Sequence, residues 1–128
     1  MKLGRTAHAC FMAMAMGLGM AAGHAAAQIN PFGRSPNMPR LDPEDRRLLW
    51  DSADALNNAT PSEAGASRNW HNPKSGNSGT VTLQRVFRAN GMPCHALHYT
   101  VTLAAQQTQR TYDINWCRIQ TGEWKIAE

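Results

Sequence analysis

The sequence lacks the patterns that mark a metal site, a nucleic-acid surface or a second membrane segment. Its three cysteines form no C-x-x-C motif, and its five histidines include no H-E-x-x-H motif. No cluster of Lys and Arg is interleaved with aromatic residues. After the first 27 residues no long apolar run occurs. We therefore expect no metal or other cofactor and no nucleic-acid partner.

The first residues of the chain have the pattern of a secretory leader. Lys2 and Arg5 precede an apolar stretch over residues 7–22, and Ala25 and Ala27 fit the A-x-A rule for signal peptidase. An uncleaved membrane anchor is the alternative, but the apolar run is shorter than the roughly 20 residues that a spanning helix needs. We predict a signal peptide over residues 1–27.

The remainder divides into a tail and one domain. Residues 28–40 hold several prolines, which predicts a flexible Pro-rich tail. Residues 41–128 are long enough for one small domain. Cys10 lies inside the leader, so only Cys94 and Cys117 remain after processing.

The domain begins with a helix signal. Asp42 is a suitable N-cap, Pro43 fits the first helical position, and Asp45 completes a variant capping box. Apolar residues follow at helical spacing, namely Leu49, Ala53 and Leu56. We predict a helix of about four turns that ends near Asn57 and Asn58.

The rest of the domain has the pattern of a sheet. Alternating apolar residues separated by turn formers predict strands over Ser67–His71, Thr80–Phe87, Cys94–Leu103, Thr108–Ile119 and Glu123–Ile126. The predicted fold is α+β, with one N-terminal helix packed on a four- to five-stranded antiparallel meander sheet that carries one disulfide.

The register of one hairpin follows from two constraints. If Cys94 faces Cys117, paired residue numbers sum to a constant, and Leu97 lies opposite Ile114. The same register gathers the apolar side chains on one face, and a one-residue slip would break both this face and the disulfide.

Disulfides persist in oxidising compartments, so we expect an exported protein in the periplasm, outer membrane or cell surface of a Gram-negative bacterium.

The preceding hairpin does not fit so simply. In its first strand, Val81, Leu83 and Phe87 alternate onto one side. A two-residue turn at Asn90-Gly91 would pair Phe87 with Cys94 and turn these three side chains away from the shared face. We therefore predict a bulge, or a loop of three or five residues, between Arg88 and Cys94.

Few residues have the pattern of a catalytic or metal site. His98 and Asp113 would be cross-strand partners, and such a pair can orient an imidazole as a base, but no Ser or Cys nucleophile accompanies them. His95 and His98 are three residues apart, which on a strand places them on opposite faces. We expect a surface pair, no metal site and no enzyme.

Two surface features are candidates for binding. The turn after the first strand contains Trp70, Asn72, Pro73, Gly76 and Gly79, and it is either a rigid connection or a binding tip. Four arginines could form a basic rim for anionic lipid or polysaccharide, with a solvated face as the favoured reading: Arg85, Arg88, Arg110 and Arg118.

Three blocks of the sequence resemble the C-terminal domain of the seventeen-kilodalton outer-membrane surface antigen family. They are Leu41-Asp42-x-x-Asp45-Arg46, then Trp70-His71-Asn72-Pro73-x-Ser75-Gly76-Asn77-x-Gly79-x-Val81, and then Cys117-Arg118-x-x-x-Gly122-x-Trp124 with Cys94 upstream. The resemblance implies an envelope protein without a known enzymatic role, and it transfers no catalytic residue.

The expected function is that of a non-enzymatic exported envelope protein with a structural or binding role. Its partner would be an envelope component or another exported protein, and peripheral contact with a membrane is compatible with this expectation. The alternative is a small accessory or inhibitor protein that binds an exported enzyme.

Overall fold

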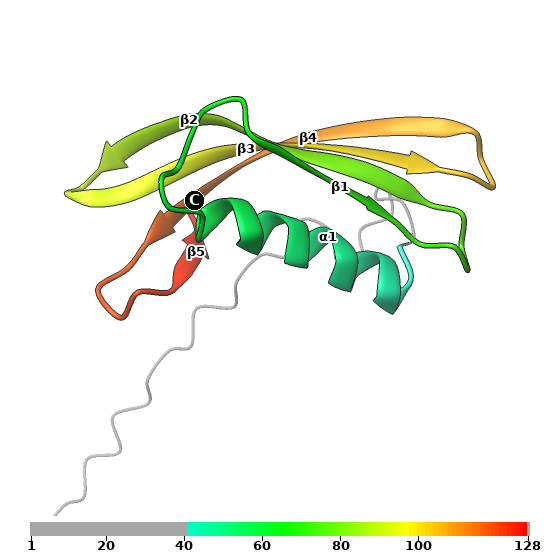
Figure 1. Ribbon diagram of the computed structural model, residues 1–128, viewed down its shortest axis with the longest axis horizontal. Helices are drawn as coiled ribbons and strands as arrows, with labels where there is room; N and C mark the ends of the chain where they lie inside the picture. The colour runs from blue at the N-terminus through cyan, green and yellow to red at the C-terminus, as the bar shows by residue number, and fades with distance from the viewer. Residues whose placement is uncertain (1–40, 128) are drawn as a thin grey trace, which may run out of the picture.

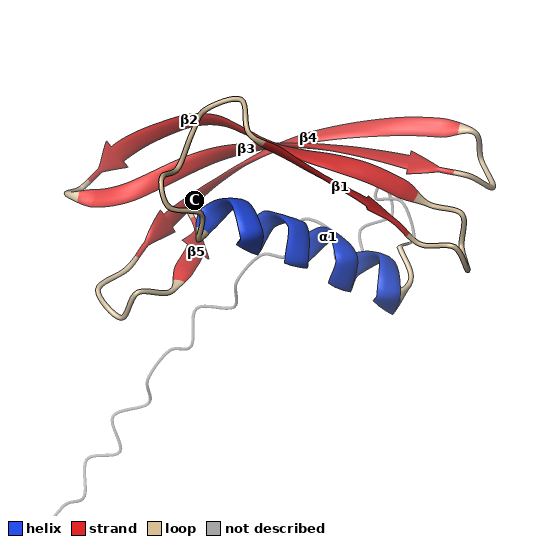
Figure 2. Cartoon of the chain, viewed as in Figure 1, coloured by secondary structure: helices blue, strands red, loops and turns tan. Residues whose placement is uncertain are grey.

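The computed structural model describes residues 41–127, so the predicted signal peptide and Pro-rich tail lie outside the described residues. Helix α1 (Pro43–Asn57) lies along one face of a five-stranded antiparallel sheet (Figures 1 and 2). The strands follow one another in the order β1 (Ser67–His71), β2 (Ser78–Ala89), β3 (Met92–Leu103), β4 (Thr108–Arg118) and β5 (Trp124–Ile126). The predicted α+β meander is confirmed.

Helix α1 begins at the capping box that the sequence predicts. The Asp42 side chain accepts a hydrogen bond from the Asp45 N–H at 2.8 Å, and the Asp45 side chain accepts one from the Asp42 N–H at 3.1 Å. Pro43 is the first helical residue, where its missing N–H costs nothing. With 15 residues and several charges, this helix is too short and too polar to cross a bilayer, and residues 41–127 contain no helix that could.

The core lies between α1 and the face of the sheet that it covers, which we call the inner face. Helix α1 packs on β1 and β2. Alternate residues of β3 are fully buried, as expected for a strand with one face on a core. The buried apolar side chains of the helix and the central strands are Leu49, Ala53, Leu56, Val81, Leu83, Leu97, Tyr99 and Val101.

Strands β3 and β4 pair in the predicted register. Cys94 lies opposite Cys117 and Leu97 opposite Ile114, and the two sulfur atoms form a disulfide. Because side chains alternate along a strand, this disulfide lies on the outer face of the sheet, away from α1. The apolar alternation and the cysteine pairing therefore require the same register.

The β2–β3 hairpin corrects one prediction. The turn has only two residues, with positive φ of 49° at Asn90 and 77° at Gly91, and the irregularity lies at Gln84 within β2 rather than after Arg88. The register shifts between Leu83 and Arg85. The extra residue reverses the alternation, so the first part of β2 keeps its apolar side chains on the inner face.

The same bulge changes the side of Phe87. This residue pairs with Cys94 and so shares the outer face with the disulfide, whereas Val81 and Leu83 pair with Tyr99 and Leu97 on the inner face. The sequence placed all three β2 residues on one side, which is wrong for Phe87.

We predict that the disulfide stabilises the domain by about 3 kcal/mol, because it closes a loop between cysteines that are 23 positions apart. Chemical denaturation of the oxidised and the reduced protein measures this difference without any substitution. The double variant Cys94→Ser/Cys117→Ser should then unfold at the denaturant concentration of the reduced protein or below it. Equal stability of the oxidised and reduced forms would contradict the prediction.

Candidate functional site

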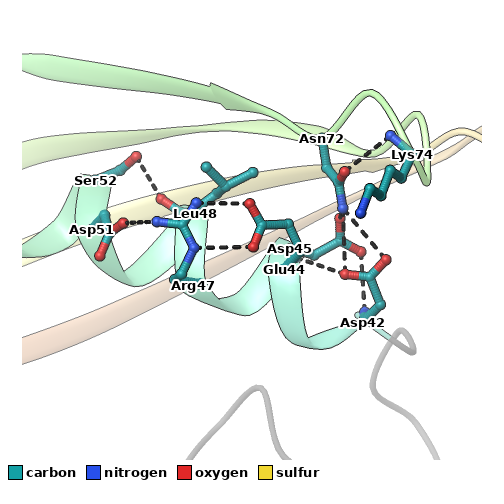
Figure 3. Close-up of polar contacts among 9 residues, drawn as sticks. All are labelled: Asp42, Glu44, Asp45, Arg47, Leu48, Asp51, Ser52, Asn72 and Lys74. Carbon is teal, nitrogen blue, oxygen red and sulfur yellow. Dashed lines mark hydrogen bonds and ion pairs between the residues drawn. The ribbon is translucent and has the colours of Figure 1, made fainter.

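The turn that connects β1 to β2 packs against the N-terminus of α1. Its backbone closes on itself, because Asn72 N–H donates to the Asn77 carbonyl at 2.9 Å and Gly76 N–H donates to the Asn72 carbonyl at 2.8 Å. The Asn72 side-chain oxygen accepts from the Lys74 N–H at 3.0 Å. Figure 3 shows the Asn72 side chain directed from this turn toward Asp42 and Asp45.

Asp45 is the centre of this contact. Its carboxylate is fully buried and accepts hydrogen bonds from Asn72 Nδ2 at 2.8 Å, Ser75 Oγ at 2.7 Å and Asn77 Nδ2 at 2.8 Å. The Asp42 N–H provides a further donor at 3.1 Å. We call these five residues the Asp45 cluster. A buried carboxylate with this many donors is satisfied, so it holds the turn against the helix.

The ionisation of Asp45 follows from the balance of two effects. Burial raises the pKa of this carboxyl, but the hydrogen bonds from Asn77, Ser75, Asn72 and the Asp42 backbone together outweigh burial and lower it below the ordinary value of 3.8. The folded state therefore favours the charged form of Asp45. The cluster is a charge-dependent contact between the helix and the sheet.

The cluster extends to the far end of the β3–β4 hairpin. The Asn77 side-chain oxygen accepts a hydrogen bond from the Ala104 N–H at 3.0 Å. One turn thus contacts both the helix N-terminus and the turn between β3 and β4. Sequence reasoning assigned Asp42 and Asp45 to helix capping alone, and the amide and hydroxyl groups at Asn72, Ser75 and Asn77 were the available signal for the wider contact.

Some of the predicted turn residues are buried and others are exposed. Trp70 is in the core, and Asn72 is buried in the Asp45 cluster. Gly79 lies so close to its neighbours that a Cβ atom would be 2.2 Å from the Thr100 carbonyl oxygen and 2.6 Å from Trp70 Nε1. Pro73 and Gly76 are exposed, and Gly76 has a φ of +75°. The residues of this turn therefore form a structural contact, and a binding role for its exposed part stays a prediction.

The predicted His98–Asp113 pair is present on the outer face. His98 Nδ1 lies 2.6 Å from Asp113 Oδ1, and their side chains are 31% and 72% exposed. Across the sheet, His98 pairs with Thr82 on β2, and Thr82 pairs with Ser67 on β1, so these side chains form one row with Asp113. Cys94 and Cys117 are in the disulfide, so neither is available as a nucleophile. This geometry provides an oriented imidazole and no reacting partner among the described residues.

His95 points to the opposite face, as the strand alternation predicts. It is buried, its Nδ1 lies 2.9 Å from Asn57 Oδ1, and its ring stacks on Trp124 with centroids 4.3 Å apart. Burial lowers the pKa of His95. The two histidines therefore share no ligand, and residues 41–127 contain no group of three or more acidic, His or Cys side chains suited to a metal ion.

The outer face of the sheet carries rows of hydroxyl and amide groups. Every side chain in these rows is exposed or half-buried. Thr80 Oγ1 donates to Asn69 Oδ1 at 2.8 Å across β1 and β2. Following the register from β1 to β4, the rows are Ser67–Thr82–His98–Asp113, Asn69–Thr80–Thr100–Thr111 and His71–Ser78–Thr102–Gln109. We call these rows the polar outer face.

Comparison with known proteins gives one family. The sequence pattern of the family described as 17 kDa outer membrane surface antigen matches residues 57–125, from the last residue of α1 into β5. A 17 kDa surface antigen of Rickettsia felis is 37% identical over 88 residues, which cover 68% of this chain and 53% of that protein. The corresponding protein of Rickettsia prowazekii is 36% identical over 87 residues, covering 67% of this chain and 52% of the relative.

The chain thus spans about half the length of the curated relatives it matches. No solved structure gives a significant match to it. The matched segment includes the β1–β2 turn, both cysteines of the disulfide and all strands of the polar outer face.

We predict that Asp45→Asn destabilises the domain by about 3 kcal/mol at neutral pH, because the substitution removes the charge that the buried donors surround. Denaturant unfolding measures the loss. Asp51→Asn is the matched control in the same helix, since its side chain is 61% exposed and its ion-pair partner among the described residues is Arg47, and it should cost less than about 1 kcal/mol.

The contribution of Asp45 to the stability of the domain should decrease at low pH. Because folding lowers the pKa of Asp45, its contribution is fully present above the ordinary value of 3.8 and is lost as the pH falls through the lower folded-state value. The stability difference between the wild type and Asp45→Asn should therefore shrink in acid. A difference that stays constant as the pH falls would contradict the charge-dependent contact.

We predict that Gly79→Ala destabilises the domain by about 3 kcal/mol, because its Cβ would overlap backbone and an indole ring that cannot easily move. Gly91→Ala is the control, since a Cβ there meets no atom within 4 Å and costs only about 1 kcal/mol for its positive φ. Thermal or denaturant unfolding of the two variants gives the comparison. Equal losses would show that the close approach at Gly79 contributes nothing.

Proposed function

Because the chain belongs to the family of 17 kDa outer membrane surface antigens, we propose that it is a non-enzymatic envelope protein that binds a hydroxyl-rich glycan of the cell envelope. The relatives are named as surface antigens, which fits an exported protein. We place it in the periplasm or on the outer surface of a Gram-negative cell. The binding surface that we assign is the polar outer face.

The observation that carries this proposal is the chemistry of the polar outer face. Hydroxyl and amide side chains both donate and accept hydrogen bonds, and so do the hydroxyl and acetamido groups of glycans. The central row, Asn69–Thr80–Thr100–Thr111, has no ionisable side chain and crosses four strands. Neighbouring strands lie roughly 4.8 Å apart, so the row presents regularly spaced partners to an extended polymer.

The buried polar groups near the helix are already used within the protein. The Asp45 cluster is internally satisfied, and His95 is buried against Asn57. The side chains of the polar outer face, by contrast, are accessible on the surface. This difference favours binding through the sheet over binding through the helix or the core.

A catalytic role receives less support. His98 and Asp113 are held together at 2.6 Å, but the threonine and serine side chains that continue their row form no hydrogen bond with His98 among the described contacts. Nucleophilic catalysis requires a nucleophile within hydrogen-bond reach of its base. We therefore assign the pair to the binding surface.

We predict that the purified protein sediments with insoluble peptidoglycan and that Thr100→Val/Thr111→Val weakens this binding about 30-fold. Valine keeps the β-branched shape and removes two hydroxyl groups, each worth about 1 kcal/mol in hydrogen bonding. Thr108→Val is the matched control, because Thr108 pairs with the buried Leu103 on the inner face.

The experiment can fail in two informative ways. Equal binding of the wild type and the double variant would remove the polar outer face as the site. Absence of sedimentation, together with crosslinking of one exported enzyme in stoichiometric amount in intact cells, would replace glycan binding by the accessory or inhibitor role.

A further inference from the structure

One end of the molecule combines exposed apolar side chains with arginines that have no ion-pair partner among residues 41–127. This end consists of the β2–β3 turn region and the adjoining end of β4, and Figure 1 shows the hairpin extending beyond the end of α1. In the register, Arg88 lies opposite Pro93, and Phe87 lies opposite Cys94. We call the following residues the tip patch: Arg85, Val86, Phe87, Arg88, Pro93 and Arg118.

Three residues give the tip patch its positive charge. The Arg85 guanidinium lies 4.5 Å from the centroid of the Phe87 ring. Arg88 donates to the Gly91 carbonyl, and Arg118 donates to the Gly122 carbonyl at 3.1 Å. No carboxylate among residues 41–127 forms an ion pair with these arginines, so most of their guanidinium donors remain available.

The arginines of the tip patch differ from Arg47 on the helix. Arg47 is neutralised by Glu44 at 2.7 Å and by Asp51 at 2.6 Å. Glu123, the acid that follows Arg118 in the chain, lies 3.7 Å from the Lys125 ammonium group. The positive charge of the tip patch is therefore not cancelled locally, which makes this end complementary to an anionic surface.

The arrangement also refines the basic rim that the sequence suggested. Arg85, Arg88 and Arg118 lie at the disulfide end of the sheet, near the β2–β3 turn and the Cys94–Cys117 bond, with Arg85 on the outer face and Arg88 on the opposite face. Arg110 does not join them, since it pairs with Val101 toward the other end of β4.

Apolar side chains accompany these charges on both faces of the hairpin, with Phe87 beside Arg85 on the outer face and Val86 beside Arg88 on the opposite face. Val86 is 47% exposed, which is unusual here for a large hydrophobic residue, and Pro93 is also exposed. Phe87 is half-buried beneath Arg85. Apolar residues flanked by arginines at a protruding turn fit a membrane interface, where the apolar groups reach the acyl boundary and the guanidinium groups contact phosphates.

We propose that the tip patch docks this protein on membranes that contain anionic phospholipids. The arginines bind headgroup phosphates through charge-assisted hydrogen bonds, and Val86 and Pro93 enter the interfacial layer. This contact is separate from glycan binding by the polar outer face, so either proposal can fail without the other.

The test is flotation of the purified protein with lipid vesicles. Vesicles of phosphatidylethanolamine with phosphatidylglycerol should carry the protein, vesicles of phosphatidylcholine alone should carry much less, and added salt should weaken the binding. Arg85→Gln/Arg88→Gln should lower the partition coefficient about 25-fold, since each arginine near an anionic surface accounts for roughly fivefold.

A matched variant distinguishes binding through the tip patch from a general effect of the protein's net charge. Arg68→Gln/Arg110→Gln removes the same number of charges from β1 and β4 away from the tip, and it should change binding little. Val86→Ser should reduce binding without changing the charge. Equal loss in the two double variants, or no preference for anionic vesicles, would overturn the proposal.

Discussion

A single buried carboxylate joins the helix of this domain to its sheet. Asp45 starts α1 through the capping box and at the same time accepts hydrogen bonds from the β1–β2 turn. The same turn also accepts a hydrogen bond, because the Asn77 side-chain oxygen binds the Ala104 N–H next to the β3–β4 turn. A buried charge is stable only where donors surround it, so its presence fixes where the helix begins relative to the sheet.

With the helix held in this place, one face of the sheet is buried and the other is accessible. The inner face is filled by apolar side chains and by His95, whose ring lies between Asn57 and Trp124. The outer face carries the disulfide at one end and rows of hydroxyl and amide groups along its length. A small domain whose helix covers only one face must leave the other in contact with solvent or a partner. The architecture as well as the side chains thus leaves the outer face accessible for the binding that we propose.

Sequence analysis predicted correctly those parts of the fold for which two independent constraints give the same answer. Cys94 and Cys117 required the same β3–β4 register as the apolar alternation, and the capping residues agreed with the helical spacing. The position of the bulge was predicted wrongly, because the sequence shows that β2 needs one extra residue but not where the residue is inserted. Any position in β2 that inserts one residue restores the inner face, and the sequence does not distinguish Gln84 from the residues after Arg88. The Asp45 cluster was missed because it joins segments about 30 residues apart by side-chain geometry alone.

Charge placement follows from the same topology. The disulfide holds the ends of β3 and β4 together on the outer face, and the short Asn90-Gly91 turn returns β2 beside them. Arg88 and Arg118 are distant in sequence but lie at this end together with Arg85, whereas Glu44 and Asp51 of α1 pair with Arg47 and Asp45 binds the β1–β2 turn. Positive charge is thereby concentrated at one end of a protein whose formal net charge is +4. Orientation at an anionic surface depends on such a separation of charges rather than on their sum, because screening limits each contact to about 8 Å at physiological salt.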